Sequence, residues 1–295
     1  MIFSKEKTIQ GHAGAIYACT ASDDFIYTGS TDKYVARWII DQGIQDKFAI
    51  KFEASIYALE EFGNRYLVVG LSTGDLHIFD LIEGKEIKHF TQHVKAIFSI
   101  KWNSSKNQLV VGDADGNLSI WNSSSLELLI YLPLDAGKIR DIALSPSGDQ
   151  FAIACQDQSI RILESEYFNE IKTLEGHENG ANSVCYHPTN PNLLISGGKD
   201  ALLKLWNIKN SELVKKIPAH NYAIYSIISL NNKNTILTSS RDKTIKVWSS
   251  DLTFMQRLDF KDGGHKHSVN KIRKLDEDRF VSVSDDKSII IWRGE

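Results

Sequence analysis

Short stretches of alternating apolar and polar residues recur along the whole chain, separated by small polar residues. In the sixth unit of this pattern, four stretches predict β-strands at residues 213–217, 223–229, 235–239 and 244–248. Asn, Gly, Asp and Ser fill the gaps between them, as expected of tight turns. No stretch of useful length has the period of an amphipathic helix. The pattern therefore predicts an all-β chain of short antiparallel strands.

Each unit ends in a strand that an aromatic or leucine residue closes, and these residues fix the period. They stand at positions 38, 79, 121, 163, 206, 248 and 292, so successive spacings are 41, 42, 42, 43, 42 and 44 residues. Where a turn Asp is kept, it lies six residues before its aromatic, as Asp242 does before Trp248. A period of about 40–45 residues is that of a four-stranded propeller blade. We therefore predict a seven-bladed β-propeller of four-stranded antiparallel blades, with residues 1–295 forming a single domain.

The two ends of the chain are expected to meet in one blade. The seventh unit ends at Trp292 without a fourth strand, and residues 5–10 match the fourth strands that precede His residues elsewhere. We predict that Lys5–Gln10 pairs with Ile289–Trp292, because a closed ring leaves only short, protected sheet edges. Turns between the first two strands are predicted in three units, at residues 145–148, 188–191 and 231–234.

Composition and charge narrow the classes of partner. The net charge is −3 and Lys and Arg are scattered, so neither nucleic acid nor an anionic membrane is an expected partner. No run approaches the roughly 18 apolar residues that a membrane helix needs. The three cysteines, Cys19, Cys155 and Cys185, form no close pair, and the first residues lack a secretory signal. We expect a cytoplasmic protein whose cysteines are reduced and buried.

Residues before the first strand and at the end of the third carry a family resemblance. Gly-His pairs occur at Gly11-His12, Gly176-His177 and Gly264-His265, with weaker forms at Gln92-His93 and Ala219-His220. No unit has a literal Trp-Asp pair, and the nearest are Phe79-Asp80, Trp121-Asn122 and Trp206-Asn207. With seven units in register, the chain resembles the WD-repeat (WD40) β-propeller family over nearly its whole length.

The resemblance implies a hydrogen-bonded network inside the blades. It would join a His, a Ser or Thr, the turn Asp and the Trp in the four sets His12–Thr28–Asp32–Trp38, His177–Ser196–Asp200–Trp206, His220–Thr238–Asp242–Trp248 and His265–Ser282–Asp286–Trp292. Val111 is expected to break the network in the third unit. Phe52 and Asp135 replace the His in the second and fourth units, whose blades should be less rigid. A loop three residues longer before Ser183 puts the role of His177 in question.

The His–Asp pairs beside a hydroxyl suggest hydrolytic catalysis, but their recurrence in four blades favours a structural role, since catalysis needs one site. Gly70–Gly74 matches a nucleophile motif only at a tight turn, and Asp113–Asn117 lacks the distal Glu of a calcium loop. His265 and His267 have no third ligand in view. We therefore expect no catalytic residue, no cofactor and no metal.

The resemblance also places partner binding on the top face, where the innermost strands begin. The matching positions are Tyr17, Tyr57, Phe98, Arg140, Cys185, Tyr225 and Asn270, and those before the turn Asp include Lys199 and Arg241. The residues just before the first group are mostly small, with Ser183 and Lys138 among them. Tyr and Arg dominate interface hot spots. The predicted partner-binding residues are Tyr17, Tyr57, Phe98, Arg140, Tyr225, Asn270, Lys199 and Arg241.

Two other interpretations stay open from the sequence. The aromatic residues could simply plug the channel and pack against one another, with no partner. A propeller enzyme of hydrolase or lyase type would place several His, Asp or Glu at the channel mouth, and the seven positions named above hold none. The favoured hypothesis is a non-enzymatic scaffold, monomeric by itself, that binds another protein or a peptide.

Overall fold

A computed structural model describes residues 2–230 and 234–294, and it contains seven four-stranded sheets. The first four blades, numbered in chain order, are built from β2 (Ile16–Ala21), β3 (Phe25–Ser30), β4 (Tyr34–Ile39) and β5 (Ile44–Lys51); β6 (Ile56–Phe62), β7 (Tyr66–Leu71), β8 (Leu76–Asp80) and β9 (Lys85–Phe90); β10 (Ile97–Asn103), β11 (Gln108–Asp113), β12 (Asn117–Asn122) and β13 (Leu128–Pro133); and β14 (Ile139–Leu144), β15 (Gln150–Cys155), β16 (Ser159–Glu164) and β17 (Glu170–Glu175).

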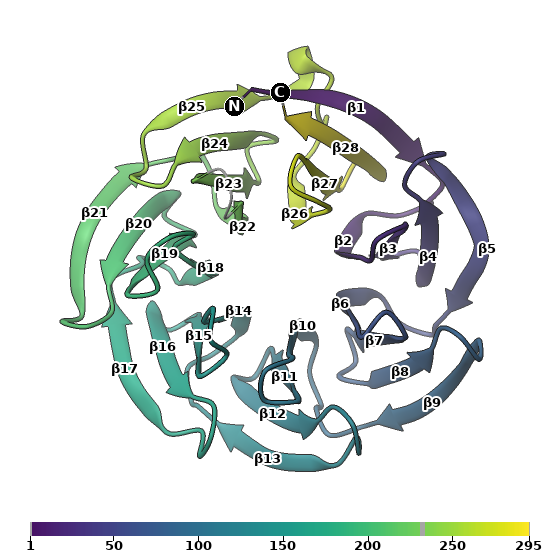
Figure 1. The fold of residues 1–295 in the computed structure, drawn as a ribbon, viewed down its shortest axis with the longest axis horizontal. Helices are drawn as coiled ribbons and strands as arrows, with labels where there is room; N and C mark the ends of the chain where they lie inside the picture. The colour runs from purple at the N-terminus through teal and green to yellow at the C-terminus, as the bar shows by residue number, and fades with distance from the viewer. Residues whose placement is uncertain (1, 231–233, 295) are drawn as a thin grey trace.

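The remaining three blades are built from β18 (Ala181–Tyr186), β19 (Leu193–Gly198), β20 (Leu202–Asn207) and β21 (Glu212–Pro218); β22 (Ile224–Leu230), β23 (Thr235–Ser240), β24 (Ile245–Ser249) and β25 (Phe254–Leu258); and β26 (Val269–Lys274), β27 (Arg279–Ser284), β28 (Ser288–Gly294) and β1 (Phe3–Gln10). A 3₁₀ turn, η2 (Phe260–Asp262), follows β25. All pairings are antiparallel, and Figure 1 shows the blades in a ring with β2, β6, β10, β14, β18, β22 and β26 innermost. The predicted seven-bladed propeller is confirmed.

The seventh blade joins the two ends of the chain. Strand β1 pairs with β28, with Lys5 opposite Trp292 and Ile9 opposite Ile289. The predicted closure of the ring by the N-terminal strand is therefore confirmed, and the two termini lie side by side in Figure 1. Gln256 of β25 also holds β1, because its Nε2 donates to the Phe3 carbonyl oxygen at 2.8 Å.

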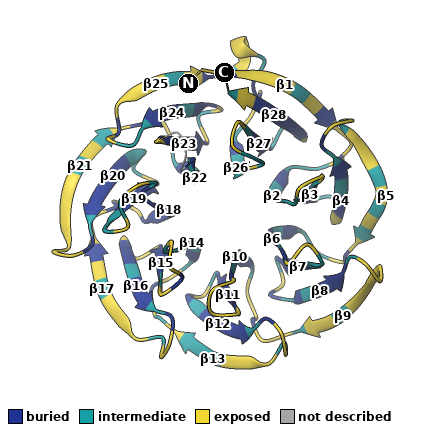
Figure 2. Ribbon diagram, viewed as in Figure 1, coloured by how far each residue is buried: buried dark blue, intermediate teal, exposed yellow. Residues whose placement is uncertain are grey.

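The hydrophobic core lies between blades rather than at one centre. Each of seven clusters combines buried side chains of two neighbouring blades; Ile16 and Trp38 of blade 1, for example, pack with Ile289 of blade 7. A glycine permits the closest approach, since a Cβ at Gly29 would lie 2.3 Å from a methyl of Ile56 in the next blade. Figure 2 shows exposed residues concentrated on the outer strands, and burial is most continuous in the second strand of each blade, as in β3 and β7.

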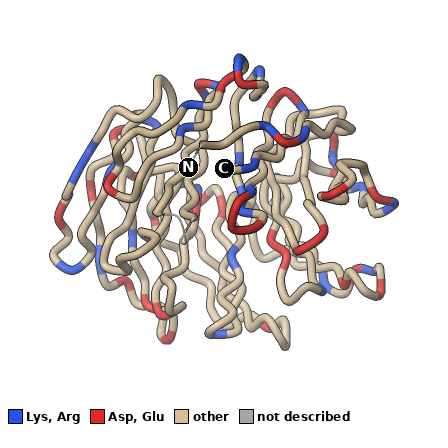
Figure 3. Tube along the Cα trace, turned by 45° about the horizontal axis from the view of Figure 1, so that its top comes forward, with Lys and Arg blue, Asp and Glu red and all other residues tan. Residues whose placement is uncertain are grey.

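The turn at residues 145–148 and the mixed surface charge agree with the sequence-based expectations. At the predicted turn 145–148, the Gly148 N–H donates to the Ser145 carbonyl at 2.9 Å. Of the turn predicted at 231–234, residues 231–233 lie outside the described part. Among the described residues, no helix is long and apolar enough to cross a membrane. Figure 3 shows acidic and basic residues interspersed over the surface, in keeping with the small net charge.

Candidate functional site

The four predicted sets of His, hydroxyl, Asp and Trp are each brought together inside their blades. The His Nδ1 lies 2.8–3.1 Å from the Asp carboxylate in all four sets. The His Nε2 lies 2.7–2.8 Å from the hydroxyl oxygen, and the Trp indole N–H donates to that oxygen at 2.7–2.9 Å. Each hydroxyl is therefore the centre of a chain of hydrogen bonds that runs from strand to turn.

The direction of these bonds follows from what each group can donate. A carboxylate only accepts, so the imidazole Nδ1 carries the hydrogen and the neutral Nε2 accepts from the hydroxyl. Burial lowers the pKa of His220, which keeps this imidazole neutral. Burial opposes ionisation of Asp242, but hydrogen bonds from His220 and Thr244 outweigh it, and the pKa of Asp242 lies well below its ordinary value. The network is a satisfied structural unit.

The third blade keeps the network, which corrects the expectation that Val111 breaks it. Ser119 lies directly opposite Val111 in the β11–β12 register and supplies the missing hydroxyl. His93 Nε2 lies 2.7 Å from Ser119 Oγ, and the Trp121 indole donates to the same oxygen at 2.8 Å. The carboxylate comes from the fully buried Asp113, 2.7 Å from His93 Nδ1. Both groups therefore come from other positions than in the four predicted sets: the hydroxyl from β12, and the carboxylate from Asp113 of β11 and not from the turn Asp115.

Blades 2 and 4 have different polar contacts. In blade 4, Arg161 donates to Asp157 at 2.9 Å and to the Leu134 carbonyl at 2.7 Å, in a region where the other blades have the His. In blade 2, the rings of His77 and His89 stack with centroids 4.2 Å apart. The expectation that these two blades are less rigid stays a prediction.

The stacked histidines of blade 2 also belong to the group best placed to hold a metal. Among the described residues, His77, Glu86 and His89 can bring three ligand atoms within 4.8 Å of one another. Each imidazole already has a carboxylate partner: His77 Nδ1 lies 2.7 Å from Glu86 and His89 Nε2 lies 3.0 Å from Asp75. The group is thus complete as a pair of surface hydrogen bonds.

A β-bulge at the second residue of every innermost strand defines the upper mouth of the channel. The pairing register shifts there in all seven blades. The bulged residues are Tyr17, Tyr57, Phe98, Arg140, Asn182, Tyr225 and Asn270. One backbone bond recurs above each bulge, from the residue before the turn Asp to the residue before the strand, at 2.9–3.1 Å. Because a bulge redirects its side chain, these residues form a single layer.

The fifth blade corrects the sequence alignment at Cys185. Strand β18 begins at Ala181, four residues after His177, which is the spacing of the other blades. The bulged residue is therefore Asn182, and the Lys199 N–H donates to Gly180, not to Ser183. Ala181 stands where the other blades have Ile or Val. Because alanine is only weakly apolar, the sequence pattern did not mark it as the start of the strand. The supposed longer loop does not exist, and Cys185 lies deeper in the channel.

Four of the predicted upper-mouth residues contact one another in a row. The ring centroids of Tyr17 and Tyr57 are 5.3 Å apart, and those of Tyr57 and Phe98 are 5.6 Å apart. The Arg140 guanidinium lies 4.5 Å from the centre of the Phe98 ring. Directly beneath the three rings lies a void of only about 10 Å³, which Lys101, Lys271 and Arg273 also line. On the side of blades 1–3 the aromatic residues thus close the channel.

A cavity of about 670 Å³ opens beside this row. All eight predicted partner-binding residues line it, together with Asn182 and Tyr222, which the sequence alignment missed. Tyr222 is 59% exposed and lies under the Arg241 guanidinium, 5.9 Å from its ring centre. Asn270 is partly committed to the ring, since its Nδ2 donates to the Ile16 carbonyl of blade 1 at 2.9 Å.

Three cations of this cavity have no acidic partner. Within the described part of the chain, Arg140, Lys199 and Arg241 form no ion pair. Burial lowers the pKa of Arg140. Burial, together with the charges of Arg140 and Lys138, also lowers the pKa of Lys199. An anionic group entering this cavity would relieve both effects.

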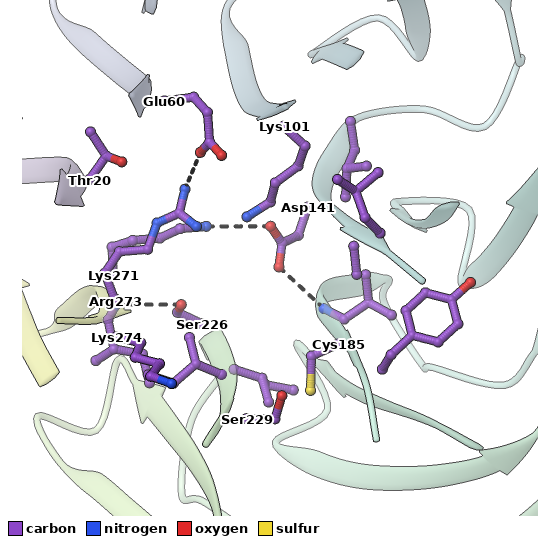
Figure 4. Close-up of a pocket in the computed structure, with 18 of the residues that line it drawn as sticks. Thr20, Glu60, Lys101, Asp141, Cys185, Ser226, Ser229, Lys271, Arg273 and Lys274 are labelled. Carbon is purple, nitrogen blue, oxygen red and sulfur yellow. Dashed lines mark hydrogen bonds and ion pairs between the residues drawn. The ribbon is translucent and has the colours of Figure 1, made fainter. Parts of the chain in front are cut away.

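A second set of charged residues lies below the upper layer, and the sequence analysis missed it. They project from the innermost strands β6, β10, β14 and β26 into one cavity of about 480 Å³ (Figure 4). They are Glu60, Lys101, Asp141, Lys271 and Arg273. Charged residues at channel-facing positions of otherwise apolar strands were the available signal.

Comparison with known families agrees with this geometry. The family model described as "WD domain, G-beta repeat" matches residues 3–38, 84–122, 132–163, 168–207, 211–249 and 257–293. The chain therefore belongs to the WD40 family. The unmatched segment 39–83 contains most of blade 2, which lacks the His–Asp network of its neighbours.

Individual relatives are distant. The chain is 26% identical over 208 residues to a guanine nucleotide-binding protein subunit beta of Zea mays, covering 66% of this chain and 54% of the relative. It is 24% identical over 267 residues to the kinesin-like protein KIF21A of Homo sapiens, covering 88% and 15% of the two chains. A U3 small nucleolar RNA-associated protein 15 homolog of Gallus gallus is 22% identical over 200 residues, covering 67% and 38%. The chain spans about half the length or less of these relatives.

Proposed function

We propose that this propeller is a non-enzymatic interaction scaffold that binds an acidic segment of a partner protein at its upper mouth. The observation that carries the proposal is the set of three unpaired cations, Arg140, Lys199 and Arg241, around one cavity. Aromatic side chains next to them offer rigid contact area with a polar tip, the combination found in interface hot spots. An acidic segment carrying an aromatic residue matches both features.

The aromatic residues of the upper mouth can both fill part of the channel and contribute to binding a partner. The row from Tyr17 to Arg140 fills one side of the channel and gives the cavity a firm wall. Tyr222 and Tyr225 line the open side near Arg241. A partner would therefore meet a preformed surface, which limits the entropy lost on binding. The relatives include a protein named as a subunit, in keeping with assembly into larger complexes.

The proposal includes a cytoplasmic location. The three cysteines are free and buried, and burial raises the pKa of Cys19 to about 11. Such thiols are unreactive small apolar side chains that suit a reducing compartment. Fractionation of cells followed by detection of the native protein tests this, and recovery from an oxidising compartment would contradict it.

A charge-reversal experiment tests the upper mouth. The probe is a fluorescent peptide of Glu, Asp, Tyr and Gly, with a matched peptide in which Gln and Asn replace the acids. Reversing Arg140, Lys199 and Arg241 to Glu should weaken the acidic peptide about 100-fold or more in fluorescence anisotropy. The control reverses three exposed cations of the outer strands, Lys47, Lys88 and Lys216, and should leave affinity nearly unchanged. Equal losses in both variants, or equal binding of the two peptides, would refute the site.

The aromatic residues need a separate variant. Tyr222→Ala combined with Tyr225→Ala, on the open side of the cavity, should leave the thermal midpoint close to that of the wild type while reducing capture of the acidic peptide. A lower midpoint with unchanged capture would mean that these side chains only fill the channel.

A further inference from the structure

The lower cavity has an excess of positive charge at its inner end. Lys271 Nζ lies 3.4 Å from Asp141, and Arg273 pairs with Glu60. Lys101, the third cation, forms no hydrogen bond or ion pair with any described residue (Figure 4). Of these five charged groups, three are positive and two negative. The wall also carries Glu61 and Lys274, and Lys274 pairs with Glu277. Among the five groups of the cluster, Lys101 is the cation without an acidic partner.

Lys101 is held where an unpaired charge is costly. It projects from β10 toward Asp141 and the two cations of β26. Burial, followed by the charge of Arg273, lowers the pKa of Lys101 to about 8. Buried ammonium groups normally have a partner, and their desolvation is otherwise uncompensated. A ligand anion at this point would supply the missing partner.

The same cavity wall includes Tyr186, which also carries a buried polar group. The Tyr186 hydroxyl is buried and has no hydrogen-bond partner among the described residues, and the tyrosine is 6% exposed. Buried polar groups in folded proteins are almost always bonded, so an exception calls for an explanation. Tyr186 and Lys101 are on different blades, and both belong to the cavity wall. The hydroxyl itself is closed off from the cavity, so Tyr186 contributes part of its ring to the wall, and Lys101 is the polar group that a ligand can reach.

The rest of the wall is largely apolar and sets the size and character of the ligand. Ile228, Leu144, Pro146 and Pro188 line the cavity beside the charged cluster. A volume of about 480 Å³ is that of a small-molecule site. A doubly charged anion would also be repelled by Glu60 and Asp141, which favours a single negative charge.

From these observations we propose that the lower cavity binds a monocarboxylate with an apolar body, its carboxylate on Lys101 and its body along the apolar wall. This site shares Lys271 with the wall of the upper cavity but does not rest on the function proposed for the upper mouth. A free small molecule and the carboxyl end of a peptide chain share this chemistry. The experiment below distinguishes the two sources.

The test uses simple probes titrated calorimetrically into the full-length protein. Hexanoate has the charge and the apolar body, hexan-1-ol has only the body, and inorganic phosphate has only the charge. Hexanoate should bind at least about tenfold more tightly than either of the others, as expected of a charge-assisted contact. If hexan-1-ol or phosphate binds as well as hexanoate, the proposal is wrong.

Variants locate the site. Lys101→Met should weaken hexanoate about tenfold or more, and Tyr186→Phe should leave it nearly unchanged because the hydroxyl is not accessible from the cavity. Lys199→Met, which removes a cation of the upper mouth, should leave hexanoate binding unchanged and serves as the matched control. Unchanged binding by Lys101→Met, or an equal loss in Lys199→Met, would overturn the assignment. Thermal melting of each variant separates loss of binding from loss of folding.

Labelling gives a readout that does not depend on variants. At pH 8 and low reagent concentration, an amine-acylating reagent should modify Lys101 ahead of ordinary lysines, and hexanoate should protect it, as mass spectrometry would measure. A short peptide ending in Leu, compared with its amidated form, then separates the two sources. Protection by the free peptide alone indicates a chain end, and protection by hexanoate alone indicates a small molecule. Absence of protection by either refutes the proposal.

Discussion

The blade interior and the wall of the channel differ in how far they repeat. Five blades place a His, an Asp, a hydroxyl and a Trp in one bonded arrangement. The seven bulged positions, on strands of the same blades, hold four aromatic residues, one arginine and two asparagines. The first set has its hydrogen bonds satisfied inside the blade, and most of the second faces a cavity. Repetition thus marks the residues that hold a blade, and variation marks those available to a ligand.

The largest effect is expected from breaking the blade interior. Thr238→Val removes the hydroxyl that lies 2.7 Å from His220 Nε2 and accepts from Trp248 at 2.9 Å. Two buried polar groups then lack a partner, which should lower the free energy of unfolding by about 2–4 kcal/mol in urea denaturation. Tyr225→Phe, at the bulge of the same blade, is the control and should change it by less than about 0.5 kcal/mol. Similar losses in the two variants would remove the distinction between the regions.

A second-site substitution in blade 3 should restore part of the stability that is lost when the network hydroxyl is removed, and its effect is somewhat smaller. Ser119→Ala should cost about 2 kcal/mol because His93 and Trp121 both bond to this hydroxyl. Adding Val111→Thr returns a hydroxyl to the directly opposite position and should recover about half of the loss. Chemical denaturation of the wild type, both single variants and the double variant measures the coupling. Independent, additive effects would mean that the network does not tolerate the exchange.

Most of the fold could be predicted from the sequence because the constraint repeats. The spacing from Asp242 to Trp248 fixes a turn and a strand together, and several units keep it. The closing strand was also predictable, since Lys5–Gln10 matches other fourth strands. The prediction that Val111 breaks the network of blade 3 failed because the hydroxyl comes from Ser119 on the neighbouring strand. The sequence shows that Ser119 has a hydroxyl, but it does not show that this residue lies opposite position 111 on the neighbouring strand.

Of the candidate site, only the residues that occupy the same position in every unit could be predicted from the sequence. The upper-mouth residues share the bulge, and one misaligned unit put Cys185 in place of Asn182 because Ala181 carries little apolar signal. The charged cluster around Lys101 has no repeated counterpart. Its members come from four different strands and meet only because the ring closes. Aligning the units does place Glu60, Lys101 and Arg273 at one equivalent position of the innermost strands, but it does not show how these charges pair across the channel.

Removing the buried charge of Lys101 should stabilise the protein, whereas removing a hydroxyl from the blade interior should destabilise it. Lys101→Met is expected to stabilise the protein at pH 7 by about 1–2 kcal/mol, since it removes a buried, unpaired ammonium. Its folded pKa of about 8 lies below the ordinary 10.5, so the unfolded chain binds more protons between these values. The contribution of Lys101 to wild-type stability should therefore rise with pH through this window, while the buried thiols, whose pKa values are raised, act with the opposite sign in both proteins. The advantage of the variant over the wild type should shrink toward zero near pH 10.5.

Denaturation of both proteins at pH 7, 9 and 10.5 measures this difference, as the first and last values bracket the titration of the amine. The charged groups facing Lys101 are Glu60, Asp141, Lys271 and Arg273, and the buried thiols of Cys19 and Cys185 lie nearby. Because the thiols are common to both proteins, the change of the stability difference with pH reports mainly on the Lys101 amine. A variant less stable than the wild type at pH 7 would show that Lys101 supports Glu60 and Asp141 as the networks support a blade. The channel wall would then be structural at that point as well.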